Sequence, residues 1–290
     1  MSEDSANLIA FQGAPGAYSD LACRHVYPDM TTLPCAQFED AFAAVREGRA
    51  ALGMIPIENS VAGRVADIHH LMPDSGLFII GEHFDPVHHH LLAVPGATLD
   101  TIRTVRSHVH ALGQTRKWLR RHGLTPVVAA DTAGAAAEIA ERGDKTVAAI
   151  ASELAGRIYG LVSLAENIED AEHNTTRFMV MAREAQWAAH GRLAVTTFVF
   201  NVRNVPAALY KALGGFATNG VNMTKLESYM VGGRFTATQF YADVEAHPDD
   251  TPLKLALEEL RFFSTEVKIL GVYPAHQLRL EARRRENESA

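Results

Sequence analysis

The sequence of 290 residues has little cysteine and no long apolar run. Its two cysteines, Cys23 and Cys35, are too few for a disulfide framework and lack the CxxC spacing of metal or redox sites. No stretch approaches the roughly 20 apolar residues of a membrane helix. Residues 1–7 have neither the basic nor the apolar part of a signal peptide. We therefore expect a cytoplasmic protein that is not inserted in a membrane.

Basic charge is also scarce. The chain has 27 Lys and Arg against 34 Asp and Glu, a net charge of −7. Nucleic acids and anionic membranes are bound by basic surfaces, so we expect neither as a partner. An anionic substrate would need a locally positive pocket. Hydrophobic residues make up 47%, which is enough to bury the cores of about two domains.

Several common catalytic motifs are missing. The chain has no G-x-G-x-x-G or P-loop pattern of nucleotide-binding proteins, no G-x-S-x-G pattern of α/β-hydrolases and no H-E-x-x-H pattern of zinc metalloproteases. The sequence therefore does not support any of these functions. The run of His88, His89 and His90 lies in an expected strand, where His88 and His90 would share a face. Zinc usually takes three or four ligands, so this pair is more typical of a partly buried strand. We expect no metal site.

Short strands and amphipathic helices alternate as far as residue 182. Strands are expected at 8–12, 52–57, 77–81, 87–94, 126–130, 146–150 and 177–182, with a short extended segment at 104–107. Helices are expected at 19–26, 38–45, 65–72, 111–122, 132–142 and 153–159. This alternation predicts parallel sheets covered on both faces, in two α/β lobes.

The order changes beyond a linker at 186–193. Its expected elements are strand 194–202, a helix from Pro206 to Phe216, a hairpin of 221–230 and 235–244 around a Gly232-Gly233 turn, helix 253–263 and strand 267–273. This βαββαβ order is the α+β ferredoxin-like unit. By analogy of fold, it suits a small regulatory module. Residues 279–290 are nearly all charged or small, which predicts a frayed tail.

Two segments carry candidate chemistry. At 55–60, polar side chains end a strand before an expected helix, where they could hold an anion. On the pattern alone, the favoured alternative is that Asn59 or Ser60 caps that helix. At 174–178, two hydroxyls and a guanidinium precede a strand and could bind a carboxylate and donate to a leaving group. They could also form only local loop hydrogen bonds. The residues alone leave both pairs of alternatives open.

Taken in order, these segments resemble the prephenate dehydratase family with a fused ACT regulatory domain, from about residue 9 to 273. The matching segments are 13–19, 56–60 with Gly63, Ser107-His108 with Gln114, 176–178, 208–213 and 222–228. The resemblance implies a catalytic domain of two α/β lobes similar to a periplasmic binding protein, with the chain crossing near 82–91 and 169–177. It places this domain at 1–185, the linker at 186–193, the ACT domain at 194–275 and a charged tail at 276–290.

The family's reaction converts prephenate to phenylpyruvate in phenylalanine biosynthesis. The ring carboxylate leaves as CO₂, and its electrons expel the 4-hydroxyl as the ring becomes aromatic. The substrate is its own electron sink, so no cofactor is expected. The resemblance places Thr176 nearest the departing hydroxyl, as a hydrogen-bond donor acting directly or through water. The implied substrate-binding residues are Asn59, Ser60, Ser107, Gln114, Arg177 and Ser19. Arg177 could pair with a carboxylate or orient its loop.

The ACT match implies L-phenylalanine as an effector, held between ACT domains of a homodimer or homotetramer. The implied effector-binding residues are Ala207, Ala208, Leu209, Asn222, Met223, Glu227 and Ser228. The chain departs from the family at Ala207, which stands for a glycine, and at Tyr229-Met230, which stand for Arg-Pro. Val109-His110 likewise replace the usual Pro-Gln after Ser107-His108.

Two alternative functions remain at this point. An arogenate dehydratase performs the same chemistry on a substrate with an amino group in place of the keto group. A non-catalytic cytosolic amino-acid sensor would combine a binding-protein fold with an ACT domain. Such a sensor would not need the adjacent Thr176 and Arg177.

Overall fold

The computed structural model describes residues 3–230 and 237–289. The expected Gly232-Gly233 turn and the start of the expected strand at 235 lie outside the described residues. Within the described part, no helix is long and apolar enough to cross a membrane. The chain forms two compact units, which we call unit 1 (Met1–Ile68 and His83–Phe178) and unit 2 (His69–Glu82 and Met179–Ala290).

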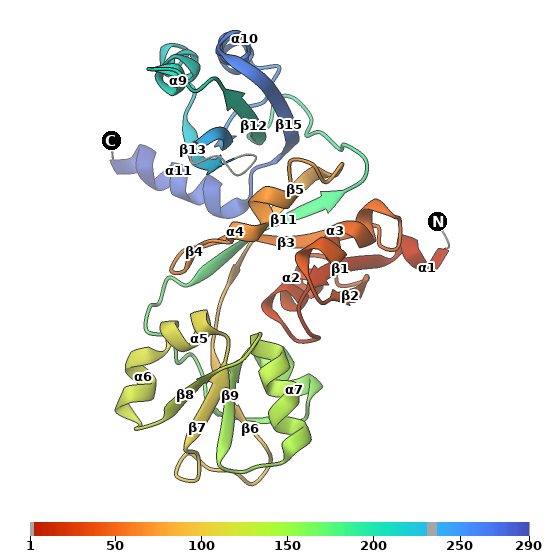
Figure 1. Ribbon diagram of the computed structural model, residues 1–290, viewed down its shortest axis with the longest axis vertical. Helices are drawn as coiled ribbons and strands as arrows, with labels where there is room; N and C mark the ends of the chain where they lie inside the picture. Colours follow the sequence, from red (N-terminus) through yellow and green to blue (C-terminus); the bar gives the residue numbers. More distant parts are fainter. Residues whose placement is uncertain (1–2, 231–236, 290) are drawn as a thin grey trace. The chain divides into compact units, whose positions relative to one another are not determined.

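The first lobe of unit 1 is built on a parallel sheet (Figure 1). Strand β1 (Leu8–Gln12) pairs in parallel with β2 (Thr31–Cys35) and with β3 (Leu52–Asn59). The lobe's other elements are α1 (Glu3–Ala6), α2 (Tyr18–Val26), α3 (Phe38–Arg46), β4 (Gly63–Arg64) and α4 (Ala66–Leu71). Strand β2 was not expected, because two threonines and a proline hide its strand pattern; it lies at the edge of the sheet, where proline is tolerated.

The second lobe of unit 1 has its own sheet, in the order β10-β6-β9-β7-β8. Its strands are β6 (His90–Ala93), β7 (Thr104–Ser107), β8 (Thr125–Val128), β9 (Val147–Ala151) and β10 (Val162–Ala165). Strand β7 is parallel to β8 and β9, as expected, whereas β6 is antiparallel to β9 and β10. Helices α7 (Thr132–Arg142) and α8 (Glu153–Ile158) follow the expected pattern. The two α/β lobes are therefore confirmed, with one sheet mixed rather than wholly parallel.

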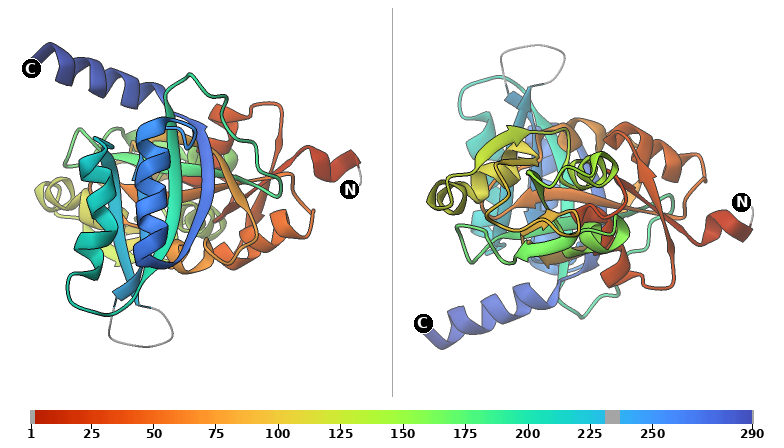
Figure 2. Two further views of the ribbon diagram at one scale, coloured as in Figure 1. Left: turned by 90° about the horizontal axis from the view of Figure 1, so that it is seen from above. Right: turned by 90° about the horizontal axis from the view of Figure 1, so that it is seen from below.

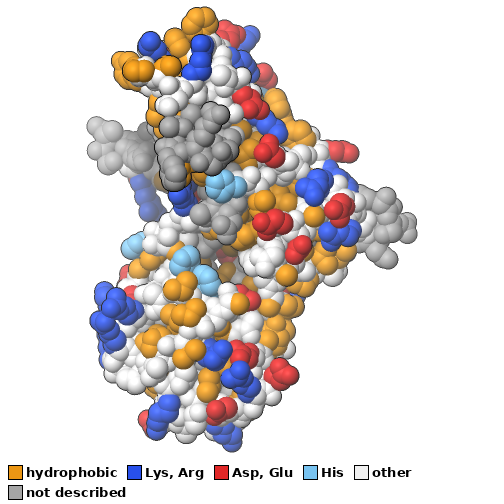
Figure 3. Space-filling view, viewed as in Figure 1, with side chains coloured by type: hydrophobic (Ala, Val, Ile, Leu, Met, Phe, Trp, Pro, Cys, Tyr) orange, Lys and Arg blue, Asp and Glu red, His pale blue; other side chains and the backbone are white. Residues whose placement is uncertain are grey.

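Two expected elements of this lobe are shorter than predicted. The helix expected at 111–122 is broken into α5 (Val109–Gln114) and α6 (Arg116–Arg121) at Thr115, whose hydroxyl donates to the carbonyl of Ala111. Such a bond back to the preceding turn competes with regular helix geometry. Exposed basic side chains gather over α6 (Figure 3). The strand expected at 87–94 begins only at His90, so His88 does not share a strand face with it.

Unit 2 confirms the βαββαβ order. Its elements are β12 (Ala194–Val202), α9 (Ala208–Thr218), β13 (Met223–Met230), β14 (Ala237–Val244), α10 (Thr251–Phe263) and β15 (Ser264–Pro274). The strands lie in the order β13-β14-β12-β15 and pair antiparallel, while α9 and α10 pack side by side on one face (Figure 2). Phe198, Phe216 and Leu257 are buried in the core between these helices and the sheet. This arrangement is ferredoxin-like.

The chain passes between the units within β5 (Phe78–Pro86) and within β11 (Thr175–Ala182). In unit 2, β5 pairs in parallel with β15 at Ile79 and Gly271. A Cβ on Gly271 would lie 2.2 Å from the carbonyl oxygen of Ile79, so only glycine fits at this approach.

The expectation of a frayed tail is wrong, because residues Gln277–Ser289 form helix α11. Arg279 anchors its first turn: Nε lies 2.7 Å from Oε1 of Glu82, and Nη1 lies 3.1 Å from Oε1 of Glu245. The composition of this charged segment does not show that Arg279 is buried between the carboxylates of Glu82 and Glu245.

Candidate active site

Asn59, the last residue of β3, connects several segments of unit 1. Its Oδ1 accepts hydrogen bonds from the N–H groups of Val61 (3.0 Å) and Ala62 (2.8 Å), so it caps the turn that follows the strand. Its Nδ2 donates to Oδ1 of Asn174 (2.8 Å) and to Oγ1 of Thr176 (3.0 Å). Asn59 therefore caps a turn and also contacts the candidate catalytic threonine.

Thr176 is the second residue of β11 and is half-buried. Its hydroxyl oxygen accepts the bond from Asn59, so its own O–H can still donate. The strand start is fixed beside Asn59 by Ser60. The Ser60 hydroxyl accepts from the N–H of Thr175 at 2.9 Å and donates to the carbonyl of His173. The contacts of Ser60 thus position the loop that carries Thr176.

Gln114, the last residue of α5, joins the same network from the second lobe. Its Nε2 donates to Oδ1 of Asn59 at 3.2 Å. Its Oε1 accepts from Nδ2 of Asn174 at 3.2 Å and faces Nε2 of His89 at 2.8 Å. The structure therefore brings together three of the predicted site residues, Asn59, Gln114 and Thr176.

A second part of the network was missed by sequence reasoning. His89 is 2% exposed, and its Nδ1 lies 2.7 Å from the hydroxyl of Tyr18. Burial lowers the pKa of His89, which keeps the ring neutral. A neutral ring has one donor, and Oε1 of Gln114 can only accept, so Nε2–H donates to Gln114. Nδ1 then faces the Tyr18 hydroxyl as an acceptor, and this hydroxyl also lies 3.0 Å from the carbonyl oxygen of His88. Burial, together with the nearby charge of Glu169, raises the pKa of Tyr18, which stays protonated.

Glu169 contacts the backbone of His89. Its Oε2 accepts from the N–H of His89 at 2.9 Å, and its Oε1 lies 3.0 Å from Nδ1 of His88. Burial raises the pKa of Glu169, but these hydrogen bonds outweigh burial and hold the pKa below its usual value. The third histidine, His90, faces the hydroxyl of Ser163. The three adjacent histidines thus have different partners and do not converge on one point.

Arg177 pairs with a carboxylate of the protein itself. It is 2% exposed, and its Nη1 lies 2.9 Å from Oε1 of Glu58. Its guanidinium carbon is 5.8 Å from the centre of the Phe84 ring, a cation–π distance. The pair fixes β11 to β3, next to the bond between Thr176 and Asn59.

Two predicted serines are placed differently. Ser107 is fully buried at the end of β7 and donates to the carbonyl of Ile150 at 2.6 Å. Ser19 is buried in the first turn of α2, directly after Tyr18. The structure does not bring the Ser107 hydroxyl into the amide network, and a role for either serine in substrate binding stays a prediction.

Gly16, in the matching segment 13–19, has a conformation and a close contact that require glycine. Gly16 has a φ of +89°, and a Cβ on it would lie 2.7 Å from Cα of Ala155. Its N–H donates to Asp20, and its carbonyl accepts from Ser152 at 2.6 Å. The motif therefore allows the loop before Tyr18 to approach α8 closely.

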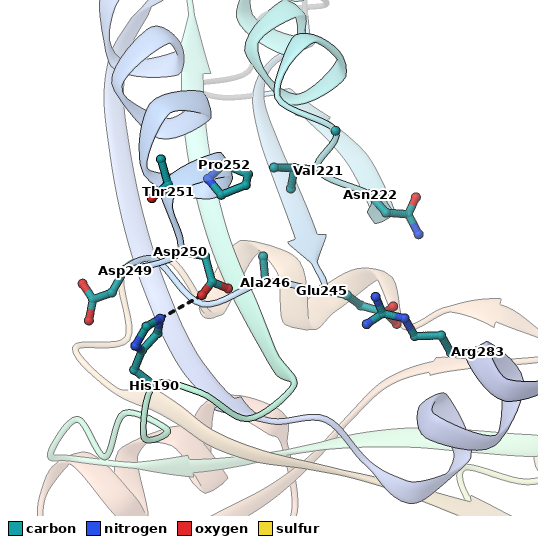
Figure 4. A pocket seen from close by; sticks show the side chains of 11 residues that line it. His190, Val221, Asn222, Glu245, Ala246, Asp249, Asp250, Thr251, Pro252 and Arg283 are labelled. Atoms are coloured by element: carbon teal, nitrogen blue, oxygen red, sulfur yellow. Dashed lines mark hydrogen bonds and ion pairs between the residues drawn. The ribbon is translucent and has the colours of Figure 1, made fainter. Parts of the chain in front are cut away.

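The predicted effector residues lie in unit 2. Ala207, before α9, has a φ of 61°, in the left-handed region. Asn222, before β13, lines a pocket of about 590 Å³ (Figure 4). Among the other lining residues, His190 lies 2.9 Å from Asp250. Helix α9, which has 11 residues and is about 16 Å long, lies between Ala207 and Asn222 in the sequence.

The family model for prephenate dehydratase matches residues 9–186. The chain belongs to the prephenate dehydratase family. Members are hydro-lyases, so the chain is an enzyme of the carbon–oxygen lyase class. In Komagataeibacter europaeus, a bifunctional N-acyl-homoserine lactone acylase/prephenate dehydratase is 56% identical, over 94% of this chain and 97% of that protein.

Two further relatives cover nearly the whole chain. Arogenate dehydratase/prephenate dehydratase 1, chloroplastic, of Arabidopsis thaliana is 40% identical over 96% of this chain and 74% of its own length. The crystal structure of a prephenate dehydratase from Arthrobacter aurescens in complex with L-Phe is 32% identical, with a TM-score of 0.85. It covers 92% of this chain and 90% of that one. The similarity to the family therefore extends through unit 2.

Proposed function

We propose that this prephenate dehydratase carries out its reaction at the cluster formed by Asn59, Gln114 and Thr176. The bond from Asn59 to Thr176 is the observation that carries the proposal. It orients a hydroxyl whose own proton remains available, beside the side-chain amides of Asn59, Asn174 and Gln114, which bond to one another. A preorganised donor of this kind needs little rearrangement when charge develops on a leaving group.

The reaction needs a donor at the departing hydroxyl. The bond between the ring and its carboxylate breaks, CO₂ leaves, and the electron pair enters the ring. The bond between C4 and the hydroxyl then breaks, and this hydroxyl leaves as water after receiving a proton. Thr176 donates the hydrogen bond to that oxygen, and the proton is supplied through Thr176 from solvent. A threonine hydroxyl is too weak an acid to protonate the leaving hydroxyl without a proton resupplied from solvent.

The ion pair between Arg177 and Glu58 favours decarboxylation of the substrate. The substrate has two carboxylates, and a cation that held the departing one strongly would stabilise the ground state more than the transition state. The charge of Arg177 is shared with Glu58. This pair would attract an anion more weakly than an isolated arginine, which favours release of CO₂.

For the whole chain we propose a cytoplasmic enzyme with a catalytic domain at 1–185, a linker at 186–193 and an ACT domain at 194–275. L-Phenylalanine, which the Arthrobacter aurescens relative binds, is the proposed effector. The proposed homodimer or homotetramer rests on the resemblance of residues 194–275 to ACT domains.

Two relatives suggest other substrates. The plant relative's name includes arogenate dehydratase activity, which differs only at the side-chain carbon of the substrate. The Komagataeibacter europaeus relative's name includes N-acyl-homoserine lactone acylase activity, and its 56% identity makes that activity the second candidate function here.

A side-by-side turnover assay tests these proposals. The purified full chain is incubated separately with prephenate, arogenate and an N-acyl-homoserine lactone, and phenylpyruvate, phenylalanine and free homoserine lactone are measured. We expect phenylpyruvate from prephenate, before and after treatment with EDTA. Turnover of arogenate alone would make the chain an arogenate dehydratase. Release of homoserine lactone alone would make it an acylase, and no turnover of any of the three compounds would leave a sensor.

A further inference from the structure

Two histidines and an aspartate of unit 1 converge at a point outside the hydrogen bonds that join Asn59, Gln114 and Thr176. His25 lies in the last turn of α2, while His83 and Asp85 alternate along β5 and so point to the same side of that strand. Nδ1 of His25 is 3.0 Å from Oδ1 of Asp85, and Nε2 of His83 is 3.6 Å from the same oxygen. One ligand atom from each residue lies within 4.8 Å of the other two.

We propose that His25, His83 and Asp85 bind a divalent transition-metal ion, with Zn²⁺ as the first candidate. Two imidazoles and one carboxylate form a donor set that zinc takes in open sites, with water as the fourth ligand. Bonds of about 2.0–2.1 Å in a tetrahedron place neighbouring ligand atoms about 3.3 Å apart. The separations of 3.0 Å and 3.6 Å from Asp85 lie on either side of this value, and the two imidazole nitrogens lie within 4.8 Å of one another.

The surroundings of Asp85 support a cation there. The residue is 5% exposed, and its Oδ2 is buried with no hydrogen-bond partner among the described residues. A buried carboxylate oxygen without a partner is costly, and a metal ion or its bound water beside the carboxylate would offset that cost.

The site is open on one side. The side chain of His25 is 51% exposed, whereas that of Asp85 is 7% exposed. An ion can therefore enter from solvent at His25 and keep a water in the remaining position. By joining the end of α2 to β5, the ion would stabilise unit 1 near the helix that carries Tyr18. The reaction itself does not pass through this ion, so the proposal does not depend on the proposed function.

Metal titration of the full chain tests the proposal. The protein is stripped with EDTA, dialysed, and titrated with Zn²⁺ by calorimetry and with Co²⁺ by visible absorption. We expect one ion per chain, a tetrahedral Co²⁺ spectrum and a higher melting temperature with Zn²⁺, because a ligand of the native state stabilises it. Mg²⁺, which prefers all-oxygen octahedral sites, should produce none of these effects.

Matched variants identify the ligands. His25→Ala removes a largely exposed side chain, so the chain should fold and its Zn²⁺ affinity should fall at least tenfold. His190→Ala is the control, because His190 is also exposed and lies 2.9 Å from an aspartate, Asp250, in unit 2. Its Zn²⁺ affinity should equal that of the unchanged chain. Absence of Zn²⁺ binding, or equal binding by His25→Ala, would overturn the proposal.

Discussion

Three side-chain amides position the hydroxyl of Thr176. Asn59 bonds to Thr176 directly, and Asn174 and Gln114 hold Asn59 from two other segments. Each amide offers both a donor and an acceptor, so the three can satisfy one another without any net charge. A neutral scaffold of this kind orients a donor without adding a cation that would retain the departing carboxylate.

Removing Asn59 should affect catalysis more than folding. Asn59→Ala removes the donor to Thr176, and we expect kcat/KM to fall by about 5- to 150-fold, equivalent to about 1–3 kcal/mol for a lost bond at a charged transition state. Steady-state kinetics with prephenate measure this loss. Asn7→Ala, at an exposed asparagine of the same unit, is the control and should match the unchanged chain. Equal kinetics for both variants would contradict the role given to Asn59.

Burial of neutral His89 makes stability depend on pH. Its folded-state pKa is lowered, whereas the unfolded chain titrates near about 6.5, so below that pH the unfolded state binds more protons. The contribution of His89 to stability is therefore complete above about pH 6.5 and is lost as the pH falls towards the folded pKa. Denaturant unfolding at pH 8 and pH 5.5 should show a smaller loss of stability for His89→Gln than for the unchanged chain. Equal losses would mean that folding does not lower the pKa of His89.

At the scale of elements, local patterns predict most of the regular structure. Helix α7 and strand β12 have the expected bounds, because a clear periodicity and sharp ends coincide there. Strands β2 and β10 were missed, since their half-exposed sequences carry little alternation. The break at Thr115 depends on a side-chain bond to the backbone, which periodicity does not report.

The candidate site was predicted only in part, because local sequence patterns do not report contacts between residues that are far apart in the chain. Asn59 and Thr176 could be proposed from the segments that contain them, although 117 positions separate them. His89 and Tyr18 lie 71 positions apart, and no local pattern links a histidine run to a tyrosine in an early loop. Likewise, the pairing of Arg177 with Glu58 follows from the adjacency of two strands, which only the fold reveals.

The conformation of Ala207 gives a test at the start of α9. Its φ of 61° places an alanine in the left-handed region, which costs an L-residue about 1–2 kcal/mol. Glycine adopts this conformation freely but also gains freedom in the unfolded chain. We therefore expect Ala207→Gly to raise the free energy of unfolding of unit 2 by about 0.5–1 kcal/mol, measured by urea denaturation. Ala208→Gly, inside the helix, should lower it; a destabilised Ala207→Gly would contradict the strained conformation.

At the scale of the whole molecule, unit 2 cannot be treated as a detachable appendage. Strand β15 pairs with β5, and Arg279 of α11 pairs with Glu82, so residues 69–82 depend on the C-terminal part of the chain. A chain cut at the linker would lose these partners. Regulation is therefore best examined in the full-length protein.

L-Phenylalanine should bind the full chain and inhibit it. A ligand shifts an equilibrium only when it favours one state, so inhibition requires tighter binding to a less active arrangement. We expect L-phenylalanine to raise the melting temperature, lower prephenate turnover and favour the dimer or tetramer on size-exclusion chromatography. D-Phenylalanine is the control and should have little effect. Equal effects of the two enantiomers would argue against a specific effector site.

The donor role of Thr176 is tested most directly by kcat on prephenate in three single variants. Thr176→Ala removes the hydroxyl, Thr176→Ser keeps it, and Thr175→Val changes the neighbouring side chain, which points to the opposite face of β11. We expect kcat to fall by about 10²–10⁴ in Thr176→Ala, with a smaller change in KM, and to be largely retained in the other two. A kcat for Thr176→Ala within about threefold of the unchanged chain, with only KM raised, would show that Thr176 binds substrate but does not assist the departing hydroxyl.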